Sequence, residues 1–213
     1  MLRTPQFTFR VVEEDDVVEG CSVSVPQRFQ WFIDDVAVID DSRWSTSGVA
    51  LLAAVSERPA LSCVPCSDSA RLEASQEAGL GRVSSYWIGP PRDGPIVRDR
   101  LGDQPVPAPP RHTFGGGLDP AADGALCFAD GDGVVVGSPP SSPPPIYDPG
   151  GTVCVIDRIT GSNRQRLLNS ALAVAFQRGD VLVNIIVAEE DEELSNLASE
   201  RGLQRTVDVF AWP

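Results

Sequence analysis

The chain has 213 residues, of which 42% are hydrophobic, so it can form one ordinary domain or two small ones with a buried core. Its formal net charge is -13, and all 17 basic residues are arginines. Nucleic acids and anionic membranes are bound through clustered basic side chains, so this balance argues against both kinds of partner. No segment is long and apolar enough to span a membrane. The N-terminus lacks a signal-peptide core, and five scattered cysteines suit a reducing compartment, so we expect a cytoplasmic protein.

The metal-binding and nucleophilic residue types are sparse. The only CxxC motif is CVPC at 63–66, and the only histidine, His112, lies in a stretch rich in proline and glycine. A zinc site needs a second cysteine pair or histidines at ligand spacing. We therefore interpret Cys63 and Cys66 as small residues of an apolar strand and expect no metal; metal or redox function is the alternative.

In the first half of the chain, apolar periodicity predicts three strands, a helix, a strand, a helix and a strand. Their ranges are 7–12, 17–25, 31–39, 47–58, 60–66, 69–79 and 81–88. The second half predicts the same order at 125–130, 134–137, 151–157, 164–176, 181–188, 189–202 and 204–212.

These two series suggest an internal repeat, with coincidence between two α+β halves as the alternative. The clearest anchor is GLGRVSS (79–85) against GLQRTVD (202–208). We predict one domain over 1–88, a connector rich in proline and glycine over 89–123, and a second domain over 124–213. The final strands contain SSYWI (84–88) and DVFAW (208–212), and their pairing would form either one sheet or a homodimer.

The element order, with a DxAVxxxxRxxxxGxALL pattern over 35–52, resembles the GNAT superfamily of N-acetyltransferases. The resemblance implies an α+β fold of tandem GNAT-like repeats, each a mixed, mainly antiparallel sheet flanked by helices. In the family, an Arg/Gln-x-x-Gly-x-Gly/Ala loop after the central strand wraps the pyrophosphate of acetyl-CoA. Here RWSTSG (43–48) keeps Arg43 and Gly48 at that spacing and has Thr46 where the first glycine belongs.

A phosphate is physically reasonable at such a junction, because a helix N-terminus offers unpaired N–H groups and a positive dipole end. The resemblance implies that the CoA-binding residues of this loop are Arg43, Trp44, Ser45, Thr46, Ser47 and Gly48. The alternative is that Ser45, Thr46 or Ser47 only caps the helix.

The resemblance also implies that the backbone of Val36, Ala37 and Val38 pairs with the pantetheine arm of the cofactor. An acid on this strand often serves as general base in the family, and Asp35 stands where such an acid commonly lies. Strand alternation predicts Asp34 on the opposite face. The alternative for Asp35 is a solvated acid at a strand end.

Several positions depart from the family pattern. The tyrosine that commonly protonates the leaving thiolate is replaced by Ser75 in the first copy and Ala198 in the second. The second junction, DRITGSNRQRLL (157–168), has Gly161 but nothing that matches Gly48. The second copy therefore looks degenerate.

Three functions follow from these observations. The first is an acyl-CoA-dependent N-acyltransferase that transfers acetyl from acetyl-CoA to a small-molecule or peptide amine. The second is a non-catalytic tandem GNAT-like binding or regulatory protein. The third is an interaction protein that docks through the polyproline-like segment 138–149, for which a simple loop is the alternative.

Overall fold

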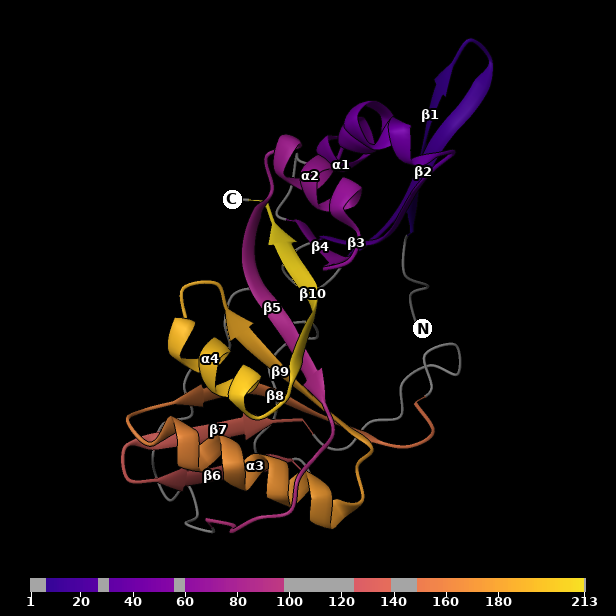
Figure 1. The fold of residues 1–213 in the computed structure, drawn as a ribbon. Helices are drawn as coiled ribbons and strands as arrows, with labels where there is room; N and C mark the ends of the chain where they lie inside the picture. Colours follow the sequence, from indigo (N-terminus) through magenta and orange to yellow (C-terminus); the bar gives the residue numbers. More distant parts are fainter. Residues whose placement is uncertain (1–6, 27–30, 56–59, 98–124, 139–148, 213) are drawn as a thin grey trace, which may run out of the picture. The chain divides into compact units, whose positions relative to one another are not determined.

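A computed structural model describes residues 7–26, 31–55, 60–97, 125–138 and 149–212 of the chain. The chain divides into two compact units. Unit 1 comprises Met1–Ser84 and Val207–Pro213, and unit 2 comprises Ser85–Thr206. Each unit is a sheet with helices, and the elements are labelled in Figure 1.

The first half of the chain contains five strands and two helical segments. The first helical segment is continuous and consists of a 3-10 turn (η1), a π-helical turn (η2) and a short α-helix (α1). The bounds are β1 Thr8–Glu14, β2 Val17–Pro26, β3 Trp31–Val38, η1 Asp41–Arg43, η2 Trp44–Gly48, α1 Val49–Ala53, β4 Ala60–Pro65, α2 Ser69–Glu77 and β5 Gly81–Gly89.

The second half follows the same order, with a longer first helix. The bounds are β6 Leu126–Asp130, β7 Gly133–Gly137, β8 Val153–Thr160, α3 Arg164–Arg178, β9 Leu182–Ala188, α4 Glu192–Glu200 and β10 Gln204–Ala211. The predicted repeat of three strands, a helix, a strand, a helix and a strand is therefore confirmed in both halves. The α+β class with tandem repeats is confirmed with it.

The final strand of each half contributes to both units. The hydrogen-bonded strand order is β1-β2-β3-β4-β10-β5-β9-β8-β7-β6. Residues 81–84 of β5 belong to unit 1 and residues 85–89 to unit 2, whereas residues 204–206 of β10 belong to unit 2 and residues 207–211 to unit 1. As a result β10, from the end of the chain, pairs antiparallel with β4, with Phe210 opposite Ser62. The predicted pairing of the two final strands is found within one chain.

The predicted domain boundaries fall differently from the boundaries of these units. A boundary at residue 88 assigns nearly all of β5 to the first domain, and a boundary at residue 124 assigns all of β10 to the second. Each strand is in fact shared between the units. The predicted connector is described only as far as Val97, in unit 2, and most of segment 138–149 also lies outside the described residues.

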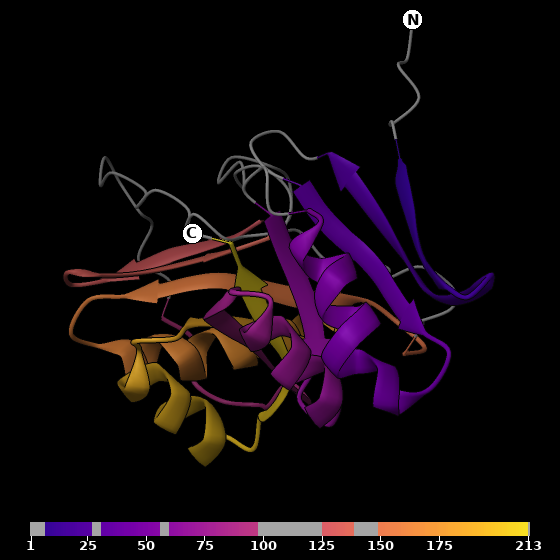
Figure 2. The same ribbon diagram turned by 90° about the horizontal axis from the view of Figure 1, so that it is seen from above.

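Each unit has its own hydrophobic core. In unit 1, α1, α2 and η2 pack on one face of the strands, around Ile33, Leu51, Val64 and Phe210. In unit 2, α3 and α4 cover one face of strands β6 to β9 (Figure 2). Helix α3 does so with leucines and alanines at positions 167, 168, 171, 172 and 175, a stripe of helical period. None of the helices among the described residues is long and apolar enough to cross a membrane.

Candidate functional site

The central strand of unit 1 carries a β-bulge and then separates from its neighbour. Val23 on β2 pairs with Asp35 and Ser24 pairs with Ile33, so Asp34 is the extra residue of the bulge. On its other side, β3 runs parallel to β4 in a register that ends with Ile33 opposite Ser62. β3 continues to Val38, so its backbone over 34–38 has no recorded strand partner on that edge among the described residues. This edge can accept an extended ligand.

The bulge changes the interpretation of the two carboxylates. Strand alternation no longer applies across Asp34, so the prediction that Asp34 and Asp35 lie on opposite faces loses its basis. Both side chains are exposed. Asp35 shares a face with its partner Val23, because directly opposed residues of antiparallel strands do so. Val36 is buried under the helices, whereas Ala37 is exposed.

The predicted loop at 43–48 is helical, and that part of the prediction is wrong. The helical segment begins at Asp41 and its N-cap is Asp40, whose carboxylate accepts the Ser42 N–H at 2.9 Å and also the Ser42 hydroxyl. The hydrogen bonds from Ser42 lower the pKa of Asp40. The alternative cap at Ser45, Thr46 or Ser47 is therefore also wrong, because these residues lie inside a helical segment that Asp40 already caps.

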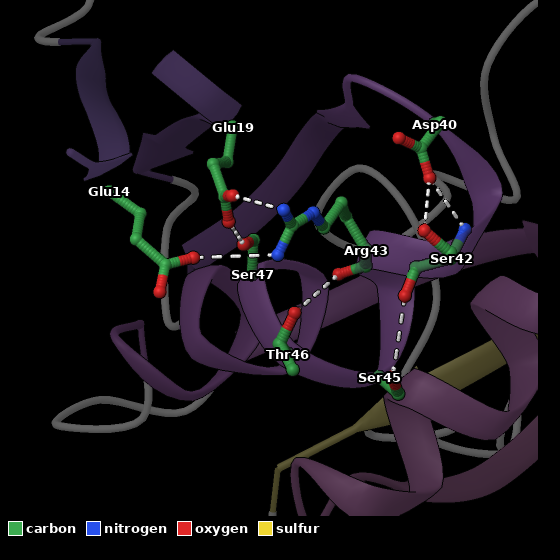
Figure 3. Close-up of polar contacts among 8 residues, drawn as sticks. All are labelled: Glu14, Glu19, Asp40, Ser42, Arg43, Ser45, Thr46 and Ser47. Atoms are coloured by element: carbon green, nitrogen blue, oxygen red, sulfur yellow. Dashed lines mark hydrogen bonds and ion pairs between the residues drawn. The ribbon is translucent and has the colours of Figure 1, made fainter. Parts of the chain in front are cut away.

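The hydroxyl groups of the segment are directed at protein atoms. Ser45 Oγ donates to the Ser42 carbonyl at 3.5 Å, and Thr46 Oγ1 donates to the Arg43 carbonyl at 3.4 Å (Figure 3). These are the back-bonds that hydroxyl side chains commonly make inside helices. A phosphate at this junction would have to displace them.

Arg43 is held by two carboxylates. Its Nη2 lies 2.9 Å from Oε1 of Glu19 and its Nη1 lies 3.4 Å from Oε2 of Glu14 (Figure 3). The Glu19 side chain is only 7% exposed, and its other oxygen accepts the Ser47 hydroxyl at 2.5 Å. A buried carboxylate requires such partners, so Arg43 and Ser47 stabilise Glu19 in this structure. The charge of Arg43 is thus already compensated.

Gly48 and Trp44 form a packing contact. A Cβ at Gly48 would lie 2.4 Å from Cε3 of Trp44, and Gly48 has an ordinary helical φ of -62°. Trp44 is 7% exposed and belongs to the core of unit 1, with the Arg71 guanidinium 5.6 Å above its ring. The glycine therefore makes room for the tryptophan ring. Trp44, Ser47 and Gly48 are all buried, and of the predicted loop only Arg43, Ser45 and Thr46 have accessible side chains.

Unit 2 repeats the bulge and the separation of the strands. Val136 pairs with Arg158 and Gly137 with Ile156, so Asp157 is the extra residue. The parallel register of β8 and β9 ends with Ile156 opposite Ile185. Asp157 is therefore the counterpart of Asp34. Sequence reasoning missed it, although the pairs Ile33–Asp34 and Ile156–Asp157 carry the signal.

The bulge of unit 2 is buried, unlike that of unit 1. Asp157 and Arg158 are each 8% exposed. Burial raises the pKa of Asp157 to about 6, although the nearby Arg158 acts in the opposite direction, and burial lowers the pKa of Arg158. Two guanidinium nitrogens of Arg158, Nε and Nη1, find no hydrogen-bond partner among the residues that the structure describes.

Acidic residues of the β6–β7 hairpin bind the residues at the junction between β8 and α3. Ser162 donates both its N–H, at 3.3 Å, and its hydroxyl, at 2.7 Å, to the carboxylate of Asp132, and Asn163 Nδ2 donates to the Asp130 carbonyl at 3.5 Å. Gly161 has a φ of +89°, and a Cβ there would meet Gly133 at 2.3 Å. Arg166 pairs with the Asp130 carboxylate at 3.3 Å. Carboxylates at this helix start would repel a phosphate.

The second helix offers no proton donor at the expected positions. Ser75 is fully buried and donates its hydroxyl to the Arg71 carbonyl at 2.8 Å, and Ala198 is fully buried. Unit 1 instead provides a stretch of β3, residues 34–38, that pairs with no strand on its β4 side within the described part of the chain, beside two exposed carboxylates. Such an arrangement can align an extended thioester along the backbone and attract a cationic amine.

Comparison with known proteins supports the fold. No protein-family model and no curated protein matches the sequence. A putative acetyltransferase from Thermoplasma acidophilum is 11% identical with a TM-score of 0.51, and the match covers 96% of this chain and 77% of that one. A GCN5-related N-acetyltransferase from Sphaerobacter thermophilus is 17% identical, with a TM-score of 0.48 over 92% of this chain and 77% of that one. A tandem GNAT protein from the clavulanic acid biosynthesis pathway is 15% identical, with a TM-score of 0.46 over 98% and 83%.

Identities this low show the fold alone. The match to the Thermoplasma acidophilum structure shows that the chain shares its fold with that putative acetyltransferase. The fold implied by the resemblance to the GNAT superfamily is thereby confirmed.

Proposed function

We propose that the protein transfers an acyl group from acetyl-CoA to an amine, with unit 1 as the catalytic unit. The observation that carries the proposal is the separation of β3 from β4 after Ile33 and Ser62. The free backbone edge over 34–38 would pair with the pantetheine arm, with Val36, Ala37 and Val38 beside it. A backbone N–H of this edge would stabilise the negative charge that develops on the thioester oxygen.

Asp35 is proposed as the general base. It is exposed on the face opposite the helices, and no hydrogen bond or ion pair to it is recorded among the described residues. It would accept a proton from the attacking ammonium and release it to solvent. The amine nitrogen would then bond to the carbonyl carbon as the carbon–sulfur bond breaks, and the second proton from nitrogen would end on the thiol.

The helical segment at 41–48 is poorly suited to bind the nucleotide part of acetyl-CoA. Arg43 would contact the pyrophosphate only by exchanging Glu14, whose side chain is 63% exposed, because Glu19 is buried and needs its pair. Ser45 and Thr46 would have to give up their back-bonds to the carbonyls of Ser42 and Arg43. Acetyl-CoA is therefore expected to bind weakly.

A second candidate is a non-catalytic binding protein with an acetyltransferase fold. The ion pairs of the arginines at the two helix starts favour this candidate. Arg43 pairs with Glu19 in unit 1, and Arg164 and Arg166 pair with Asp191 and Asp130 in unit 2. This candidate predicts no acetyl transfer to any amine.

The two candidates are separated by calorimetric titration with acetyl-CoA and with S-acetylpantetheine, which lacks the nucleotide. The acyltransferase proposal predicts binding of both. Glu14→Gln should tighten acetyl-CoA binding by about two- to fivefold, because an exposed competitor for Arg43 is removed, and leave S-acetylpantetheine unchanged. The matched control is Glu193→Gln, which removes an acid of similar exposure that pairs with Arg164 in unit 2.

The same titrations can also exclude acyl transfer. If neither ligand binds at millimolar concentration and no N-acetylated product forms with a broad amine panel, acyl transfer is excluded and the non-catalytic candidate stands. If only S-acetylpantetheine binds, the strand edge is used but the nucleotide has no site on this protein.

A further inference from the structure

One face of strands β1 to β3 in unit 1 carries exposed apolar side chains. Phe7 directly precedes β1, and Phe9 and Val11 follow it at alternate positions on that strand; the three side chains are 60%, 63% and 43% exposed. The strand register continues this face across the sheet in two rows, Phe9–Val23–Asp35 and Val11–Cys21–Ala37. Val18 at 52% and Ile39 at 62% are further exposed apolar residues of these strands and the turn that follows. We name this surface, formed by Phe7, Phe9, Val11, Cys21, Val23, Asp35 and Ala37, the open face.

The open face exists because both helices lie on the other side. Val12, Ile33 and Val36, which alternate with the open-face residues, pack into the core of unit 1 under α1 and α2. Figure 1 and Figure 2 show these helices on one side of β1 to β3. Exposed phenylalanines leave apolar area in water, and a contiguous patch of this kind marks a binding surface more often than scattered apolar residues do.

The charge of the open face is negative. Asp35 lies in the same row as Phe9 and Val23, so a carboxylate is set among apolar side chains. Glu13, Asp15 and Asp16 lie at the tip of the β1–β2 hairpin, and Asp34 is exposed next to Asp35. The chain as a whole carries a net charge of -13. An occupant of this face should therefore be cationic as well as apolar.

We propose that the open face binds the acceptor, and that the acceptor is a primary amine carried on an apolar body. That the ligand is the acceptor rests on the proposed function. That it is an amine with an apolar body rests on the side chains of the open face. The ammonium group would pair with Asp35 and the apolar body would cover Phe9 and Val11. The strand edge that would hold the thioester belongs to the same strand as Asp35, so the nitrogen and the carbonyl carbon would meet at β3.

A second copy of the chain is a less suitable occupant. Two open faces in contact would bring Asp35, Glu13 and the acidic hairpin tips toward their equivalents, and like charges at close range oppose association. A strongly polar amine such as an amino sugar would leave the phenylalanines uncovered.

The test is an NMR titration of the full isotope-labelled chain with three ligands: butylamine, hexylamine and hexan-1-ol. Hexylamine should bind about four- to sixteenfold more tightly than butylamine, because two further methylenes are covered and each is worth about two- to fourfold. Hexan-1-ol should bind about two- to fivefold more weakly than hexylamine, because an exposed ion pair is worth little more than that. The shifted amides should include those of Cys21, Val23 and Ala37.

Two variants assign the effect to the open face. Phe9→Ser should weaken hexylamine by about tenfold and reduce its advantage over butylamine, because part of a phenylalanine contact is lost. The control is Phe176→Ser, which removes a phenylalanine that is 50% exposed on α3 of unit 2 and should change nothing. Asp35→Asn should abolish the preference for hexylamine over hexan-1-ol.

The outcomes are distinct from those of the proposed function. Equal affinity for butylamine and hexylamine, shifts outside β1 to β3, or an unchanged affinity in Phe9→Ser would each overturn the inference, whatever acetyl-CoA does. Concentration-dependent dimerisation through these strands would overturn it as well. If hexylamine binds as described but acetyl-CoA does not bind, the open face is an amine site and the acyltransferase proposal fails. If both bind, N-acetylhexylamine should form, and its absence alongside acetylation of polar amines would reject hexylamine-like acceptors.

Discussion

Replacement of Phe210 by alanine tests the exchange of final strands between the two sequence halves. Phe210 lies three residues from the C-terminal end of the chain, yet it is 1% exposed in the core of unit 1, where it packs with residues of β3, β4 and α1. A predicted domain of 124–213 would instead place it in the second half's own core. The substitution therefore distinguishes the observed division of the chain from the one expected from sequence.

The expected loss follows from the burial of the side chain. A fully buried phenylalanine cut to alanine costs about 3–5 kcal/mol, from lost transfer free energy and from the cavity that remains. The whole stability of a domain is on the order of 5–15 kcal/mol, so a loss of this size removes a large share of it. Phe176→Ala, at 50% exposure on α3, should change the free energy of unfolding by less than about 0.5 kcal/mol.

Native-state hydrogen exchange gives the location of the loss. In Phe210→Ala, protection should fall most at the amides of Ile33 and Val64, in β3 and β4 of unit 1. A loss below about 1 kcal/mol, or a loss of protection confined to β8 and β9, would refute the reasoning that β10 completes unit 1.

Two further substitutions test the bulge of unit 2 and the packing of the helical junction. Because the pKa of Asp157 is raised to about 6, the folded protein binds a proton that the unfolded chain has released, so stability falls as the pH rises from about 4 to about 6 and stays low above it. Asp157→Asn should remove about 2 kcal/mol of the difference between pH 4.5 and pH 7.5 in urea unfolding, and an unchanged pH profile would show that the carboxyl titrates normally. Gly48→Ala should lower the stability by about 1–3 kcal/mol through the clash with Trp44, whereas Gly81→Ala, with open space around it, should have little effect; equal effects in the melting curves would contradict the packing account.

The sequence predicted the elements well because each is short, periodic and bounded by turn residues. Helix α3 and strand β9 were located to within two residues. An uninterrupted stripe of leucine and alanine marks the helix, and Gly179 marks its end before the strand begins. The start of the first helical segment was missed because Ser45, Thr46 and Ser47 each offered a cap, whereas the observed cap is Asp40, which is bonded to Ser42.

The strand exchange, the bulges and the role of Gly48 depend on contacts between distant residues, which local sequence patterns do not predict. β5 and β10 each follow a Gly-Leu pair after a helix and each contain aromatic residues, so neither strand's sequence indicates which unit it will complete. The roles of Asp34 and Asp157 depend on bulges that shift the register by one residue, and strand alternation cannot reveal them. Gly48 matched the spacing of a phosphate loop, yet its position is explained by the ring of Trp44.

The most direct test of the account is an NMR titration of the full chain with acetyl-CoA, read at the backbone amides of β3. The account predicts saturable shifts at the amides of Asp34 to Val38, the edge that leaves β4, with smaller changes at the equivalent edge of β8. At a ligand concentration ten times the dissociation constant, binding should also raise the free energy of unfolding by about 1.4 kcal/mol. Shifts confined to other strands, or none at millimolar acetyl-CoA, would contradict it.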